Sequence, residues 1–257
     1  MTETGTTGTV RVERRGGFAV VVLDDPGRRN ALSLEMASEL TEAVSVLEES
    51  GEVRAFVVTG APPAFCAGAD LAQLGSADET RLRAIYAGFE RVVRSPLLTV
   101  AAVNGPAVGA GINLALACDV RLAAESARFD TRFLALGLHP GGGHSWMLER
   151  AVSHSEAVAM LFGGEAVSGA EAERIGLAHR CVADDELAET AEAFVATAAA
   201  APPELVARMK ATLSLARRSS YDEALEHEVS EQLWSIGQPA FAERLAALRS
   251  KISSSGR

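Results

Sequence analysis

The segment "LLTVAAVNG", residues 97–105, constrains the fold more than any other part of the chain. Its residues are apolar up to Val103, with Thr99 as the one polar interruption. A half-exposed strand alternates polar and apolar residues, whereas a strand covered on both faces is a continuous apolar run. We therefore expect a β-strand buried between two layers of helices, which is typical of a parallel sheet in an α/β protein.

Strands and helices are predicted to alternate along the chain until about His144, after which helices dominate. The order is strand, strand, helix, repeated about three times, and this alternation indicates an α/β architecture. Residues 10–25 are expected to form two strands joined by a turn at Gly16-Gly17. The other predicted strands are residues 54–60, 97–105 and 118–125, and the predicted helices are residues 33–49 and 79–94.

The chain is expected to divide into a core of residues 1–200 and a helical C-terminal region of residues 201–257. Pro202-Pro203 breaks one predicted helix and begins the next, and a helical pattern continues from there to the end. This region carries an apolar face at helical spacing, formed by Leu225, Val229, Leu233 and Ile236. That face can serve either as an oligomer contact or as packing within the region itself.

The charge and composition of the chain argue against several classes of protein. The net charge of −10 at pH 7 argues against a nucleic-acid partner, because neutralising phosphates requires a basic face.

No apolar run reaches the roughly 18 residues of a membrane helix. The N-terminal residues lack an apolar signal segment and are expected to form a frayed tail. Three cysteines, Cys66, Cys118 and Cys181, match neither a disulfide framework nor a zinc site. We therefore expect a cytoplasmic protein with no metal ion and no membrane attachment.

Two glycine-containing turns are the best candidates for a functional site. The segments "FCAGADL", residues 65–71, and "NGPAVGAGINLALACDV", residues 104–120, each follow a predicted strand and lead toward a helix. Backbone N–H groups at the start of a helix are unpaired, and the helix dipole adds positive potential there. Two such groups from separate turns can form an oxyanion hole. The alternative is that both turns only redirect the chain. Neither turn is a P-loop or a dinucleotide fingerprint.

Several motifs together resemble the crotonase, or enoyl-CoA hydratase/isomerase, superfamily. "AFCAGADL" looks like the first signature of that family, and "AAVNGPAVGAGINLALACDVRLAAESARF" looks like the second. "GLHPGGG" matches the loop that follows, "RRNALS" an early segment and "SGAEAERIGLAHRCV" a late one. The motifs occur in the family's order along nearly the whole chain.

The resemblance implies a spiral core of repeated strand-strand-helix units, followed by a helical region that builds homotrimers, often paired into hexamers. It implies an acyl-CoA thioester as the ligand, with coenzyme A entering as part of the substrate and no other cofactor. The oxyanion-hole amides of the family fall on Ala69 and Ala110. Residues implied near the coenzyme A portion and the acyl group are Arg28, Arg29, Ala31, Ala67, Asp70, Leu71 and Phe133. Arg28 and Arg29 can equally be ordinary surface charges.

The chain departs from the family at the two glutamates with which the hydratases position and activate water. Matched motif to motif, these positions hold Asn113 and Phe133. An amide cannot be a general base, and a phenyl ring cannot carry a proton. An aspartate that other members carry further along the loop falls near Gly141 here and is also missing.

The remaining polar groups in this stretch are Asp130, Arg132, His139 and His144. The two histidines are the better candidates for acid–base chemistry, because histidine has a suitable intrinsic pKa. Asp130 is expected to cap or pair locally, with a catalytic role as the alternative. The competing interpretation makes both histidines structural. Asn113 can still hold a water molecule or a polar group of the ligand. The resemblance therefore predicts an acyl-CoA enzyme that stabilises an enolate and has unusual proton chemistry. The alternatives are an acyl-CoA binding or carrier protein without catalysis, and a hydrolase or decarboxylase of the same fold.

Overall fold

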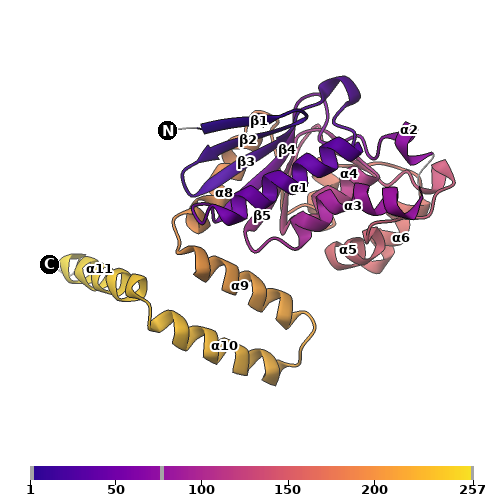
Figure 1. The fold of residues 1–257 in the computed structure, drawn as a ribbon. Helices are drawn as coiled ribbons and strands as arrows, with labels where there is room; N and C mark the ends of the chain where they lie inside the picture. Colours follow the sequence, from indigo (N-terminus) through magenta and orange to yellow (C-terminus); the bar gives the residue numbers. More distant parts are fainter. Residues whose placement is uncertain (1–2, 76–77, 256–257) are drawn as a thin grey trace. The chain divides into compact units, whose positions relative to one another are not determined.

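The computed structural model describes residues 3–75 and 78–255. The chain divides into two compact units, Met1–Ala200 and Ala201–Arg257 (Figure 1). The first unit holds both β-sheets, and the second is built from helices. Within the described ranges, no helix is both long enough and apolar enough to cross a membrane.

The larger sheet of the first unit has seven strands among the described residues, in the order β1-β2-β3-β4-β5-β7-β10. Strands β1 to β3 pair antiparallel, and all later neighbours pair parallel. The strands are β1 (Glu3–Thr7), β2 (Val10–Arg15), β3 (Phe18–Leu23), β4 (Ala55–Gly60), β5 (Leu98–Val103), β7 (Val120–Ala124) and β10 (Arg180–Val182). The expectation of a frayed N-terminal tail is wrong, because β1 pairs with the free edge of β2. The pairing needs only backbone hydrogen bonds, so the sequence of β1 carries no apolar pattern from which the strand could be predicted.

Strand β5 is buried on both faces, as its apolar run predicts. Ala101 and Val103 belong to the main core on one side, where helices α1 (Leu34–Glu49), α3 (Glu79–Val93) and α4 (Ala110–Ala117) pack. Val100 and Ala102 belong to a second cluster on the other side, together with Leu187, Ala191 and Val195 of α8 (Leu187–Ala199). The predicted α/β class is therefore confirmed, with the sheet lying between helical layers (Figure 1).

A second sheet gives the core its spiral form. It contains β6 (Pro106–Val108), β8 (Arg128–Asp130) and β9 (Val167–Ser168), in that order. Single parallel bridges between Cys66 and Ala107 and between Leu32 and Ala69 continue the same line of pairing. Each turn of the chain thus contributes one long strand to the first sheet and one very short segment to the second. The short segments escaped prediction because two or three residues carry no periodicity.

Side-chain caps mark the start of several helices of the first unit, among them α1. Ser33 caps α1 by accepting a hydrogen bond from the Met36 N–H at 3.2 Å, as its place before an apolar helix predicts. The remaining elements of this unit are η1 (Pro26–Arg28), α2 (Leu71–Leu74), η2 (Leu134–Leu136), α5 (His144–Ala151), α6 (His154–Phe162) and α7 (Gly169–Arg174).

The second unit contains α9 (Pro203–Ala216), α10 (Tyr221–Ile236) and α11 (Pro239–Ser255). Pro203 begins α9, and Ser220 with Glu223 forms a reciprocal capping box at the start of α10. Arg208 of α9 forms an ion pair with Glu231 of α10 at 3.0 Å. Within the described part of the second unit, the apolar face predicted on α10 is largely exposed, since Leu233 is 65% exposed and Ile236 is 50% exposed.

Candidate active site

Two strand-to-helix turns, at Gly68 and Gly109, lie side by side in the first unit. Both glycines have positive φ, +102° and +50°, which L side chains rarely adopt. A Cβ atom on Gly68 would lie 2.9 Å from the carbonyl oxygen of Val108 and 4.0 Å from the nitrogen of Ala110. A side chain on Gly111 would clash with the carbonyl oxygen of Cys66. The glycines therefore allow the turns to approach each other closely.

Ala69 and Ala110 directly follow the two glycines, and each carries a backbone N–H group at this junction. Ala110 is the first residue of α4, where an N–H has no partner within the helix. On either side of Ala69, Gly68 O accepts from Leu32 N at 2.7 Å and Asp70 N donates to Leu32 O at 2.9 Å. The Ala69 N–H faces away from these bonds. In the part of the chain that the structure describes, neither N–H has an acceptor.

The structure brings Asn113 and His144 into direct contact across 31 positions of sequence. His144 Nδ1 lies 2.7 Å from Asn113 Oδ1, and Asn113 Nδ2 donates to the carbonyl oxygen of Gly141 at 2.9 Å. Because Gly141 O can only accept, the amide nitrogen of Asn113 must face it, and Oδ1 must face the imidazole. Nδ1 therefore carries the proton and donates it, which leaves a lone pair on Nε2.

The imidazole of His144 is almost completely buried, at 1% exposure. Burial penalises the charged form and lowers the pKa of His144 to about 4, so the ring is neutral near pH 7. Its Nε2 atom is buried and has no hydrogen-bond partner among the described residues. An unsatisfied buried polar atom of this kind is uncommon in folded proteins and requires an explanation.

Phe133 lies between the imidazole and the Gly109 turn. Its ring makes an edge contact with the His144 ring, with the centroids 4.8 Å apart. A Cβ on Gly109 would lie 3.9 Å from Phe133 Cε1. Asn113 and Phe133 thus both contact His144.

His139 is not part of this cluster. Its side chain is exposed, and Nδ1 lies 2.7 Å from the carbonyl oxygen of the adjacent Pro140. Of the two histidines proposed from the sequence, only His144 is placed beside Asn113.

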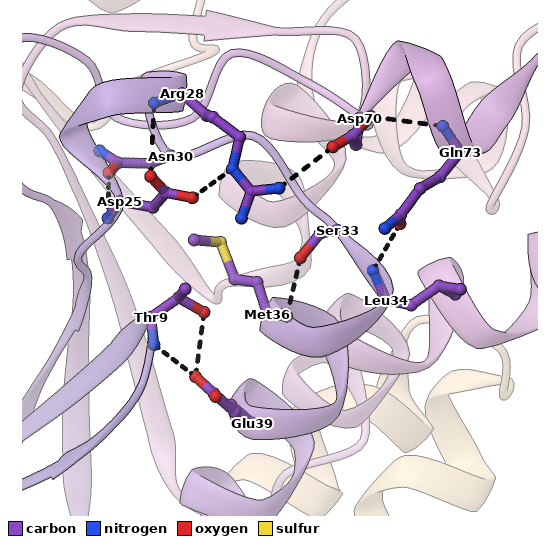
Figure 2. A network of polar contacts seen from close by, with 10 residues as sticks. All are labelled: Thr9, Asp25, Arg28, Asn30, Ser33, Leu34, Met36, Glu39, Asp70 and Gln73. Carbon is purple, nitrogen blue, oxygen red and sulfur yellow. Dashed lines mark hydrogen bonds and ion pairs between the residues drawn. The ribbon is translucent and has the colours of Figure 1, made fainter.

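The residues expected near coenzyme A form a second group around Arg28 (Figure 2). The Arg28 Nε atom lies 2.6 Å from Asp25 Oδ2, and its Nη1 atom lies 3.3 Å from Asp70 Oδ2. The hydrogen bond and charge of Asp25 raise the pKa of the Arg28 guanidinium. Asp70 also caps α2 by accepting from the Ala72 and Gln73 N–H groups at 2.9 Å and 3.3 Å. Arg28 therefore ties the first signature to the early "RRNALS" segment.

Arg29, Ala31, Ala67 and Leu71 complete this group. Arg29 is exposed, adopts a left-handed conformation with φ 53°, and forms no ion pair among the described residues. Its carbonyl oxygen accepts from Ala67 N at 3.0 Å, and Ala31 N donates to Arg28 O at 3.2 Å. Leu71 is 64% exposed at the start of α2. These backbone bonds hold the two segments next to each other.

Asn30 is a structural residue of this site that the sequence did not single out. It is fully buried with φ 58°, a conformation that asparagine tolerates better than most residues. Its Oδ1 accepts from Asp25 N at 2.9 Å, and its Nδ2 donates to the carbonyl oxygens of Ala61 and Ala64, both at 2.8 Å. Asn30 thus fixes the loop that precedes Gly68. The sequence signal that could have identified Asn30 is its place in the "RRNA" turn.

No group of three or more metal-ligating side chains occurs within the described ranges.

Comparison with known proteins identifies the family. The family model for enoyl-CoA hydratase/isomerase matches residues 13–245. The chain is 46% identical over 239 residues to the probable enoyl-CoA hydratase EchA14 of Mycobacterium tuberculosis, covering 89% of this chain and 93% of that protein. It is 32% identical over 250 residues to 4-chlorobenzoyl coenzyme A dehalogenase-2 of an Arthrobacter species, covering 94% and 91%.

A solved structure shows the same fold. It is a Thermobifida fusca YX protein assigned as an enoyl-CoA hydratase and solved in complex with acetoacetyl-CoA. It matches with a TM-score of 0.82 at 29% identity, covering 89% of this chain and 94% of that chain. This chain belongs to the enoyl-CoA hydratase/isomerase family of the crotonase superfamily, which confirms the resemblance and the predicted spiral fold.

Proposed function

We propose that the protein is an enzyme that acts on acyl-CoA thioesters and stabilises an enolate with the N–H groups of Ala69 and Ala110. The observation that carries this proposal is the pair of unpaired N–H groups on two adjacent turns. A thioester carbonyl oxygen gains negative charge when a proton leaves Cα or when a nucleophile adds to the conjugated system. Two fixed donors stabilise that charge without any reorganisation. Alanine serves at both positions because only the backbone takes part.

The coenzyme A portion is proposed to lie along residues 28–31 and 67–71. Arg29 is the better candidate for a phosphate contact, because it is exposed and forms no ion pair within the described residues. The guanidinium of Arg28 is already occupied by Asp25 and Asp70, so its role is to join the two segments. The acetoacetyl-CoA in the Thermobifida fusca structure supports an acyl-CoA as the ligand class.

The second candidate function is binding of acyl-CoA without turnover. It is favoured by one observation: neither Asn113 nor Phe133 can replace a catalytic carboxylate.

A homotrimer or hexamer is proposed for the assembly, supported by the exposed apolar face of α10. Light scattering coupled to gel filtration tests the assembly.

The test of the enzymatic proposal removes one backbone N–H and leaves every side chain in place. Lactic acid in place of Ala110 converts the amide to an ester and deletes the donor. Loss of one oxyanion donor typically lowers kcat by about 10²–10³. Hydration of crotonyl-CoA, followed by loss of enoyl absorbance, and dehydration of 3-hydroxybutyryl-CoA are the assays.

The matched control is the same replacement at Ala240, an alanine in the first turn of α11 whose N–H also has no acceptor among the described residues. Its turnover is expected to equal that of the natural protein. Equal turnover for the Ala110 ester would remove that amide from the mechanism. Tight binding of acyl-CoA with no turnover in the natural protein would favour the carrier.

A further inference from the structure

We infer that His144 is the proton-transfer residue of this site, acting through the lone pair of Nε2, and that Asn113 is the residue that positions it. This inference rests on the proposed acyl-CoA function. It names the substrate class as 2-enoyl thioesters and the corresponding 3-hydroxyacyl thioesters.

The first step is the tautomer of His144. The carbonyl oxygen of Gly141 fixes the orientation of the Asn113 amide, and the amide oxygen then requires a proton on His144 Nδ1. Asn113 Nδ2 donates to Gly141 O, and His144 Nδ1 donates to Asn113 Oδ1. This arrangement holds the ring in one orientation and leaves Nε2 as an acceptor.

The second step is the missing partner of Nε2. A buried acceptor without a donor destabilises the folded protein unless a ligand supplies the donor. The ring that packs against the imidazole is Phe133, which offers no donor. A ligand that satisfies Nε2 must therefore bring its own O–H group. Water and the hydroxyl group of a 3-hydroxyacyl chain both do so.

Charged neighbours do not explain why His144 is neutral. Burial alone lowers its pKa, with no contribution from a charged group. The phenol oxygen of Tyr86, on α3, packs against Gly141. Arg150, on the same helix as His144, stacks on Trp146. Other charged side chains of the surrounding elements form ion pairs: Asp130 with Arg132, Glu149 with His154, Glu156 with Arg174, Arg83 with Glu79 and Arg91 with Glu48. Nε2 thus keeps its lone pair at neutral pH.

The third step is access to Nε2. The atom is covered in this structure, so a neighbouring side chain must move before an oxygen atom can reach it. Phe133 is the half-buried neighbour, and the exposed segment of η2 follows it directly. Rotation of the Phe133 ring would open the imidazole toward the Gly109 turn, whose following amide is the proposed oxyanion donor.

The proposed reaction uses one proton carrier in place of two carboxylates. Nε2 of His144 takes a proton from water as the water oxygen bonds to Cβ of the enoyl thioester. The electron pair of the double bond moves to the carbonyl oxygen, where the amides of Ala69 and Ala110 hold the enolate. The imidazolium then returns its proton to Cα, and the carbonyl re-forms. The product is the 3-hydroxyacyl thioester, and the histidine ends neutral.

The experiment first reads the tautomer, independently of activity. A long-range ¹H–¹⁵N correlation spectrum distinguishes a protonated ring nitrogen from an unprotonated one. The His144 signals are assigned from their loss in His144→Asn. We expect a protonated Nδ1 and an unprotonated Nε2. A protonated Nε2 in the free protein would overturn the inference.

The second part compares variants that separate Nδ1 from Nε2. His144→Asn keeps a donor to Asn113 and deletes the Nε2 position, so it is expected to bind butyryl-CoA normally while kcat falls by about 10²–10⁴. His144→Gln places an amide at the Nε2 position, which cannot carry a proton, and is expected to lose the same activity. His154→Asn, at an exposed histidine of α6, is the matched control and is expected to retain full turnover.

Asn113→Asp tests the positioning role through a pH profile. A carboxylate at this position stabilises the imidazolium, so the acid limb of kcat/KM is expected to move to higher pH. A purely structural pair would leave the limb where it is and would overturn the inference. Full turnover in His144→Asn would do the same while leaving the acyl-CoA function intact. Failure of the natural protein to bind any acyl-CoA would instead remove the proposed function.

Discussion

Burial of neutral His144 predicts a specific loss of stability in mild acid. The pKa of His144 is about 4 in the folded protein, against an ordinary value of 6.5. Between these values the unfolded chain binds more protons than the folded one, so the free energy of unfolding falls as the pH falls. Above pH 6.5 the group is neutral in both states and contributes no pH dependence. The two pKa values give a loss of about 2 kcal/mol at pH 5 and about 3 kcal/mol at pH 4.

Urea unfolding of the natural protein and of His144→Asn, measured at intervals from pH 7.0 down to about pH 4, isolates this contribution. All other titrating groups are shared, so they cancel in the difference between the two free energies of unfolding. The natural protein should lose its advantage over the variant progressively as the pH falls. His154→Asn is the control for the same substitution at an exposed histidine. A difference for His144→Asn that does not change with pH would show that His144 titrates normally, and the reasoning from burial would be refuted.

Three further changes test other parts of the structure. Phe133→Ala uncovers the imidazole, so the pKa of His144 should rise from about 4 toward 6.5 in an NMR titration; no rise would mean that Phe133 does not shield the ring. Asn30→Ala leaves the Asp25 N–H and two carbonyl oxygens without their partner, and should lower the free energy of unfolding by about 3 kcal/mol in urea; a cost below about 1 kcal/mol would contradict its role as an anchor. Lactic acid in place of Ala69 should lower turnover of crotonyl-CoA by about 10²–10³, as at Ala110, and unchanged turnover would exclude the amide.

Much of the fold could be predicted because local pattern and long-range packing agree. The apolar run of β5 requires cover on both faces, and the structure provides it with α8 on one side and α1, α3 and α4 on the other. Ser33 and the Pro202-Pro203 pair mark helix boundaries through effects that extend over only a few residues. The second sheet could not be predicted, because its strands have at most three residues and exist only through pairing between successive turns of the spiral.

Part of the candidate site could likewise be predicted from the sequence, and part could not. The sequence predicts that two glycine turns present backbone amides, since Gly68 and Gly109 precede the residues that carry them. The resemblance to the family also predicts that Asn113 and Phe133 occupy the positions of the two hydratase glutamates. Neither conclusion depends on how distant parts of the chain meet.

The histidine that lies beside Asn113 is set by the folded chain and not by local sequence. His139 and His144 are equivalent in sequence, being two histidines of one glycine-rich loop. Packing exposes the first and buries the second against Asn113. The orientation of the Asn113 amide then depends on the carbonyl of Gly141, and the protonated nitrogen of His144 depends on that amide. A tautomer and a pKa are set by contacts and by exclusion of water, and both arise only when the chain is folded.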